Sequence, residues 1–268
     1  MLACAISPAE GQTPQGSQPL NPLSLQTIAQ YLLMLFLVAV GPVWDYFDTK
    51  PLKGNPSSAA RLGYYRRTIL WLWTATAIAI WTTGWAGLFT LHGLGIRAAW
   101  LQTRSWAWWT LAALVTLFFL VQLVLPVVQV RLKYGNRPYL EPRQFESLRF
   151  FLPSTWAERR WFAALSVTAG FCEELLFRGF VLRELIVLPL HLGLAGPVIL
   201  AAIAFASHHL YMGRAGFIST TVGGLVFTAT LLVTGNLLAC MILHALVDLS
   251  LLLYWRPRTL LGVETPRV

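Results

Sequence analysis

The chain has 268 residues, of which 56% are hydrophobic and only 12% are charged, and its mean hydropathy is +0.61. This composition excludes an ordinary soluble domain, in which about a quarter of the residues are charged. The formal net charge of +9 would suit a nucleic-acid-binding protein, but the Lys and Arg residues fall in short segments between apolar runs. Membrane topology explains that distribution better, so we expect a lipid bilayer as the surroundings and no nucleic-acid partner.

The chain begins with a polar segment, residues 1–24. This segment contains no Lys or Arg and no long apolar stretch, so it lacks the n-region and the h-region of a signal peptide. We expect a disordered amino tail.

Seven apolar runs follow, each near the roughly 20 residues that a membrane-spanning helix needs. They cover approximately 27–44, 68–91, 105–129, 161–182, 195–211, 215–234 and 237–255. The predicted fold class is therefore all-α, a polytopic membrane protein of about seven transmembrane helices, with six or eight as open alternatives.

The basic residues predict the orientation. If the amino terminus lies outside the cell, the outer loops hold only Arg97, Arg104 and Arg183, and the other basic residues of the loops and the carboxyl tail lie inside. We expect a multi-pass protein of the cell membrane with a cytoplasmic carboxyl terminus.

The longest connection runs from residue 131 to residue 160. Phe145, Leu148 and Phe151 recur there at helical spacing among charged residues, a pattern typical of an interfacial helix. Thr155 and Glu158 then form a capping-box pattern before the next apolar run, so we expect the fourth span to begin near Thr155.

Ionisable side chains divide the spans into two groups. A charged side chain at the bilayer centre costs at least ~2.5 kcal/mol, so each one needs a partner or a function. The interiors of the first three predicted spans contain none, whereas the last four contain Glu173, Glu174, Arg178, His209, His244 and Asp248. We therefore predict an amino tail (1–24), three accessory spans (25–154), a catalytic core (155–255) and a cytoplasmic tail (256–268).

The spacing of these residues predicts two polar pairs. Glu174 and Arg178 are four residues apart on one helix and can form an ion pair, which leaves Glu173, rotated by about 100°, free for another role. His244 and Asp248 have the same spacing and can meet each other or a common ligand. His209 would join them from a third helix, whereas the adjacent His208 must point elsewhere.

Three motifs in this region resemble those of the CPBP family, which comprises the type II CAAX prenyl endopeptidases and related intramembrane proteases, some linked to bacteriocin processing or immunity. The resemblance covers roughly residues 155–255. The motifs are Glu173-Glu174-Leu-Leu-Phe-Arg178-Gly179, then Phe205 with His209, then Thr234-Gly235-Asn236 with His244 and Asp248.

The resemblance implies a role for each of these residues. Glu173 would activate a water molecule that His209 helps to position, and His244 and Asp248 would stabilise the oxyanion or bind a metal. Glu174 belongs to the same catalytic motif, with Arg178 and Phe205 in support. The position of Asp248 is more often Asn in the family, and an ionised Asp cannot donate a hydrogen bond. Asp248 would therefore be protonated, orient His244, or help to hold a cation.

The sequence leaves the choice between a metal and a metal-free mechanism open. Glu173, His209, His244 and Asp248 could together bind Zn²⁺ and leave a position for water, although no HExxH motif is present. In both cases we expect a water-filled cavity among the last four spans, because hydrolysis requires water and the charges require solvation. One difficulty is that His209 falls closer to the cytoplasmic end of its span than Glu173 and Asp248 do.

The expected function is that of an intramembrane endopeptidase, a glutamate- or metal-dependent hydrolase that cleaves a membrane-associated or lipidated peptide. A non-catalytic member of the same family, acting as a membrane scaffold, immunity factor or chaperone, is the alternative. Ion or proton transport is a weaker third interpretation, because no repeats or discontinuous helices are evident.

Overall fold

The structure, a computed structural model, describes residues 24–89, 94, 105–135, 148–188 and 193–257. Nearly all of the predicted amino tail and most of the predicted cytoplasmic tail lie outside these residues. The elements within them are all helical. The first pass is a continuous helix built from α1 (Leu25–Leu35), the π-helical η1 (Phe36–Val40) and α2 (Gly41–Gly54).

The next passes are α3 (Ser58–Thr83), which the short α4 (Ala86–Phe89) follows, and α6 (Trp106–Tyr134). The fourth pass combines α7 (Trp156–Glu174), the π-helical η3 (Leu175–Val181) and α8 (Leu182–Val187). The last passes are α9 (Ala195–Ser207) with the 3₁₀ turn η4 (Leu210–Met212), α10 (Gly213–Thr234) and α11 (Leu237–Tyr254).

These elements confirm an all-α polytopic membrane protein. Within the described residues, four helical stretches are long and apolar enough to cross a membrane: 25–54, 106–132, 210–234 and 237–254. The first pass continues ten residues beyond the predicted end of its span at residue 44, and the second begins at Ser58 instead of residue 68. The connection between the first two passes is therefore shorter than the apolar runs indicate.

The fifth predicted span is the clearest correction. Residues 195–211 were expected to form one spanning helix, but α9 ends at Ser207 after 13 residues. At ~1.5 Å per residue this helix is about 20 Å long, shorter than the ~30 Å hydrocarbon core of a bilayer. His209 therefore lies in the turn after a short helix instead of within a spanning helix.

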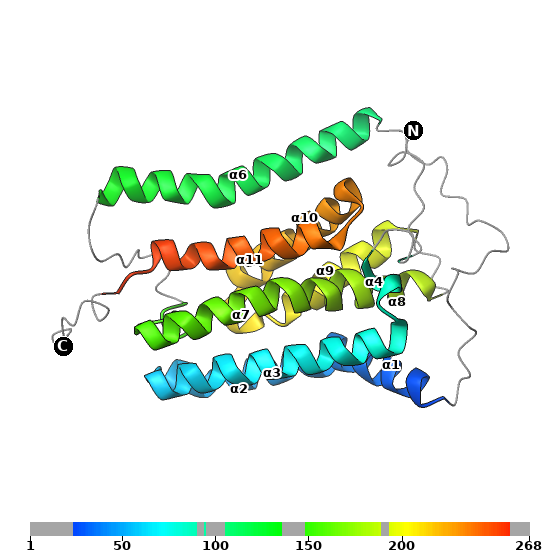
Figure 1. The fold of residues 1–268 in the computed structure, drawn as a ribbon, viewed down its shortest axis with the longest axis horizontal. Helices are drawn as coiled ribbons and strands as arrows, with labels where there is room; N and C mark the ends of the chain where they lie inside the picture. The colour runs from blue at the N-terminus through cyan, green and yellow to red at the C-terminus, as the bar shows by residue number, and fades with distance from the viewer. Residues whose placement is uncertain (1–23, 90–93, 95–104, 136–147, 189–192, 258–268) are drawn as a thin grey trace.

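The helices run along a common direction, with α7 between α3 and α11, and with α6 at the outer edge beside α10 and α11 (Figure 1). Gly170 permits the close approach of α7 to α11. A Cβ atom at Gly170 would lie 2.7 Å from the backbone nitrogen of Ala245 and 2.8 Å from the carbonyl oxygen of Met241. Such contacts involve backbone atoms, which cannot move aside as a flexible side chain can.

Gly170→Ala is therefore expected to destabilise the bundle by about 1–3 kcal/mol, as overpacking of a close-packed interior does. The measurement is the thermal melting of the purified protein in detergent. Gly223→Ala in α10 is the matched control, because a Cβ atom there meets no other group within 4 Å. Equal melting temperatures for the two variants would contradict this account of the α7–α11 contact.

The start of α7 lies where the capping pattern predicts it. The Thr155 hydroxyl accepts a hydrogen bond from the backbone N–H of Glu158 at 3.2 Å. The return bond differs from the expected one, because the Glu158 carboxylate accepts from the N–H of Ser154 at 2.7 Å and pairs with Arg61 of α3 at 2.7 Å. This buried ion pair joins α3 to the first turn of α7.

The predicted interfacial helix is described only in its last residues, since 136–147 lie outside the described residues. Residues 148–152 form a tight turn, with the N–H groups of Phe151 and Leu152 donating to the carbonyl of Leu148. Leu152 is fully buried and Phe151 packs edge-on against Tyr64, Tyr65 and Phe162. This part of the segment contributes to the core instead of lying on the membrane surface.

Candidate active site

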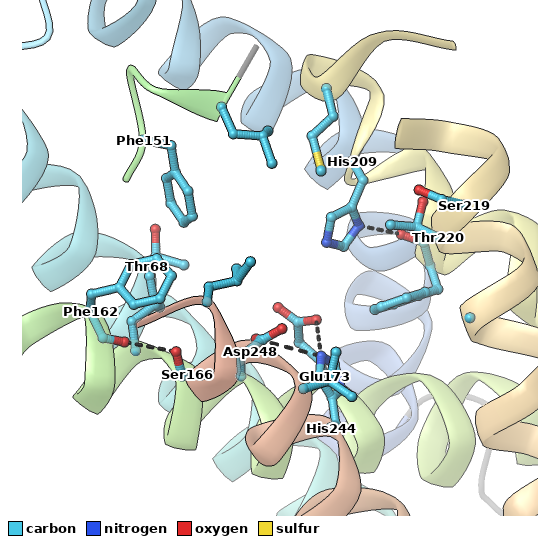
Figure 2. A pocket seen from close by; sticks show the side chains of 18 of the residues that line it. Thr68, Phe151, Phe162, Ser166, Glu173, His209, Ser219, Thr220, His244 and Asp248 are labelled. Carbon is cyan, nitrogen blue, oxygen red and sulfur yellow. Dashed lines mark hydrogen bonds and ion pairs between the residues drawn. The ribbon is translucent and has the colours of Figure 1, made fainter. Parts of the chain in front are cut away.

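Four of the six ionisable residues predicted for the site line one cavity of about 290 Å³. Glu173 of α7, His209 from the turn after α9, and His244 and Asp248 of α11 line it together (Figure 2). The cavity lies among the passes for which it was predicted. However, α3 and α6, counted as accessory in the sequence-based division, contribute lining residues too: Tyr64, Thr68, Phe118 and Gln122.

Glu173, His244 and Asp248 form the centre of the site. The Nε2 atom of His244 lies 3.9 Å from Oε2 of Glu173 and 3.8 Å from Oδ2 of Asp248, and the three side chains converge in Figure 2. Both distances exceed a direct hydrogen bond, and a separation of this kind suits polar groups that interact through a shared water. The Glu173 side chain is 17% exposed, so its carboxyl group reaches the cavity.

Glu174 lies behind His244 instead of lining the cavity. Its Oε1 atom accepts from Nδ1 of His244 at 2.7 Å and from Nη1 of Arg178 at 3.0 Å, and the residue is fully buried. The predicted pairing with Arg178 is confirmed. Because a carboxylate accepts hydrogen bonds, Nδ1 is the donor, and this bond turns Nε2 of His244 toward Glu173 and Asp248.

Arg178 and Phe205 support this arrangement, Phe205 from the cavity wall and Arg178 from behind it. The Arg178 guanidinium is 2% exposed and lies 4.3 Å from the centroid of the Phe205 ring and 5.3 Å from that of Phe227. Phe205 in turn meets the His244 ring edge-on at 6.1 Å. The charge of Arg178 is therefore balanced by Glu174 and covered by aromatic faces.

A π-helical segment, η3, begins directly after Glu174 and includes Arg178. All of its residues, Leu175 to Val181, are buried. Such segments occur frequently at functional sites, and apolar periodicity does not predict them.

His209 lies across the cavity from the other candidate residues (Figure 2). Its Nδ1 atom is 3.2 Å from the carbonyl oxygen of Phe205 and therefore donates to it, which leaves Nε2 available to the cavity. The ring stacks on Tyr211, with centroids 6.0 Å apart and an interplanar angle of 29°. In the described part of the chain, His209 makes no direct contact with Glu173, His244 or Asp248.

The predicted metal ligands are not assembled as a ligand set. Among the described residues, no group of three or more His, Cys, Asp or Glu side chains is arranged to hold a metal ion. In this arrangement the described side chains do not fit a Zn²⁺ ion, and the binding of a metal stays a prediction.

A buried pair of residues beside the site was not predicted. Nδ1 of His208 lies 2.6 Å from Oδ2 of Asp45 in α2, and Nε2 lies 2.7 Å from the carbonyl oxygen of Leu37 in η1. Gly41 provides the space, because a Cβ atom there would lie 2.5 Å from Cε1 of His208. The first pass thus holds His208 through Leu37, Gly41 and Asp45, which are spaced four residues apart. His208 thereby fixes the position of the loop that carries His209.

A second cavity of about 40 Å³ links this pair to the candidate active site. It is large enough for a water molecule. Its polar lining consists of Asp45, Tyr64, Thr68, Glu173, His208, His209 and Tyr211. The signal in the sequence was Asp45 itself, an acidic residue one position beyond the predicted end of the first span.

Asp45→Ala is expected to destabilise the protein by about 1–3 kcal/mol, because it leaves a buried ring nitrogen of His208 without its partner. Asp48→Ala is the control on the same helix. Asp48 pairs with Arg67, whose side chain is 57% exposed, so its loss is expected to cost about 0–1 kcal/mol. Thermal melting in detergent compares the two, and a larger loss for Asp48→Ala would exclude the role assigned to Asp45.

Residues 155–250, which span α7 to α11, match the model of a family described as type II CAAX prenyl endopeptidase Rce1-like. The match includes every candidate residue named from the sequence and leaves out Asp45, Tyr64 and Thr68. No curated protein and no solved structure gives a significant match to the chain.

Proposed function

We propose that this protein is an endopeptidase that hydrolyses a peptide bond within the membrane, with Glu173 as general base. The match of residues 155–250 to the Rce1-like family supports this proposal. The observation that carries the proposal is the convergence of Glu173, His244 and Asp248 on one cavity in a bundle of apolar helices. Ionisable groups inside a membrane protein are costly, and such groups mark functional sites.

In the proposed reaction, a water molecule on the cavity side contacts both the Glu173 carboxylate and Nε2 of His244, which are 3.9 Å apart. Glu173 accepts a proton from the water, and the water oxygen bonds to the carbonyl carbon of the peptide. The electron pair of the C=O bond moves to the oxygen, where His244 stabilises it by donating a hydrogen bond from Nε2 when it carries both protons. The C–N bond then breaks, and the proton held by Glu173 passes to the leaving amine.

Glu174 and Arg178 act as positioning residues in this proposal. The bond from Nδ1 of His244 to Glu174, at 2.7 Å, holds the ring so that Nε2 faces the cavity. Asp248, with Oδ2 3.8 Å from Nε2, places a second carboxyl group near the same atom from within α11. His209 contributes from the opposite wall with its free Nε2.

The proposed substrate is a membrane-associated or lipidated peptide. Much of the cavity wall is apolar, with Phe118, Phe162, Leu165, Phe227 and Leu251 among its residues, so an apolar substrate side chain or chain end fits it. We further propose a cell-membrane location with the amino terminus outside. The start of α1 and the end of α11 lie at opposite ends of the bundle (Figure 1), which agrees with termini on opposite sides of the membrane, and the basic residues favour the carboxyl-terminal side as the inner one.

The test is cleavage of a library of apolar and lipidated peptides by detergent-purified protein, compared with Glu173→Gln. Products formed by the wild type and lost in the variant support the proposal. Equal product formation by both proteins removes Glu173 from the mechanism. If the wild type binds peptides of the library without cleaving any, the non-catalytic scaffold is the better interpretation.

Metal analysis of the same preparations tests the Zn²⁺ predicted from the sequence. Stoichiometric zinc that His209→Ala removes would show that the side chains rearrange around the ion. Sub-stoichiometric zinc that the substitution leaves unchanged would favour the metal-free reaction.

A further inference from the structure

Three arginines line a third cavity, which shares no lining residue with the candidate active site. We call this the arginine cavity, about 510 Å³ in volume and lined by Arg131, Arg159 and Arg256 together with Val127, Val130, Gly135, Leu252, Leu253 and Tyr254. Its described lining contains no acidic side chain. Like charges around one cavity repel each other, so an anion bound among them would stabilise the grouping.

Two of the three guanidinium groups are held near the cavity by the fold. Arg159 donates from Nη1 to the carbonyl oxygen of Trp255 at 2.8 Å and from Nη2 to that of Leu252 at 2.7 Å. A guanidinium has five N–H donors, so other donors of Arg159 remain for a ligand. The Nε atom of Arg256 is buried and has no hydrogen-bond partner among the described residues, which is costly for a charged group.

The place of the cavity indicates where the anion comes from. Arg131 lies in the last turn of α6, Arg159 in the first turn of α7, and Arg256 two residues after the end of α11. These three helix ends lie at the same end of the bundle (Figure 1). Trp156, 64% exposed, lies at this level too, and Trp side chains favour the headgroup region of a bilayer.

We propose that the arginine cavity binds the phosphate group of an anionic phospholipid. Guanidinium groups match phosphate oxygens through paired hydrogen bonds, and the Arg256 Nε–H and the exposed Arg131 supply donors that nothing else in the described protein uses. The apolar part of the lining, from Val127 and Val130 of α6 to Leu252 and Leu253 of α11, suits the beginning of an acyl chain. A basic pocket between helices on the cytoplasmic side is the typical form of such a site.

The experiment measures the binding of three probes to detergent-purified protein by native mass spectrometry or thermal shift. The probes are short-chain phosphatidylglycerol, phosphatidylcholine of the same chain length, and inorganic phosphate. We expect phosphatidylglycerol to bind more tightly than phosphatidylcholine. Arg256→Gln and Arg131→Gln are each expected to weaken phosphatidylglycerol binding about tenfold, the effect of one lost charge-assisted hydrogen bond.

Arg214→Gln is the matched control. Arg214 is an exposed arginine in the first turn of α10 that does not line the arginine cavity, so its loss removes the same charge from the protein. Lipid binding should not change in this variant. Melting of each variant without added lipid verifies its fold, and Arg131, being exposed on α6, keeps the test valid if Arg256→Gln fails to fold.

The inorganic phosphate probe shows whether the bound anion is the phosphate group of a lipid or free phosphate. Weak phosphate binding beside tight phosphatidylglycerol binding supports the lipid as ligand. Phosphate that binds as tightly as phosphatidylglycerol, and with the same dependence on Arg256, overturns the lipid as the source while retaining the anion site. Equal affinities for the two lipids, or losses in Arg256→Gln and Arg131→Gln no larger than in Arg214→Gln, would overturn the proposal.

Discussion

Glu173→Gln is expected to reduce kcat for peptide cleavage by a factor of about 10²–10⁴, the usual contribution of a general base. Glutamine has nearly the same size and keeps a carbonyl oxygen, but its amide cannot accept the proton of the attacking water. Glu173 reaches the cavity, and its nearest ion-pair partner, Nε2 of His244, is 3.9 Å away. The substitution therefore removes the base while leaving the packing of α7 in place.

Single-turnover cleavage of one identified substrate measures this effect, with KM determined separately to show that binding persists. Glu184→Gln is the matched control, since Glu184 is bonded to Gln30 and Arg183 and does not line the cavity. A kcat for Glu173→Gln within twofold of the wild-type value would assign the proton transfer to another group.

Glu174→Leu is expected to have the largest effect on stability, a loss of about 3–5 kcal/mol, because it leaves the buried Arg178 without its counter-charge. The same substitution removes the acceptor of Nδ1 of His244, which is 2.7 Å from Oε1 of Glu174. We therefore expect both a lower melting temperature in detergent and a loss of activity in the fraction that remains folded.

The double substitution Glu174→Leu with Arg178→Leu separates these two effects. Replacing both members of a buried ion pair by apolar residues is often neutral for stability, so the double variant should melt at a higher temperature than Glu174→Leu alone. Its activity should stay low, because His244 still lacks the bond that orients it. A double variant less stable than the single one would show that Arg178 stabilises the bundle by contacts other than this pair.

The polar pairs illustrate what local sequence predicts well. Glu174 and Arg178 are four residues apart, and their ion pair forms as expected at 3.0 Å, although the helix is π-helical from residue 175 onward. His244 and Asp248 share a face in the same way, but their closest ring nitrogen and carboxylate oxygen are 3.8 Å apart. The bond that orients His244 comes instead from Glu174, 70 residues earlier in the chain.

The role of Asp45 illustrates what local sequence does not predict. The apolar run of the first pass favoured a span ending at residue 44, and the helix continues to Gly54 because α2 packs within the bundle. Its contact with His208 joins residues 163 positions apart. No periodicity in either segment specifies this contact, because it depends on which helices become neighbours.

The sequence by itself determined that this protein is an all-α membrane protein, which of its residues carry charge into the apolar spans, and which family model residues 155–250 match. These properties follow from composition and from the spacing of side chains along one helix, both of which are local. Only the tertiary structure decided that α9 is short, that Glu174 faces His244 instead of the cavity, and that the first pass and α3 reach the surroundings of Glu173. The reason is physical: contacts between helices depend on how closely their backbones can approach, as at Gly41 and Gly170, and that is a property of the packed bundle.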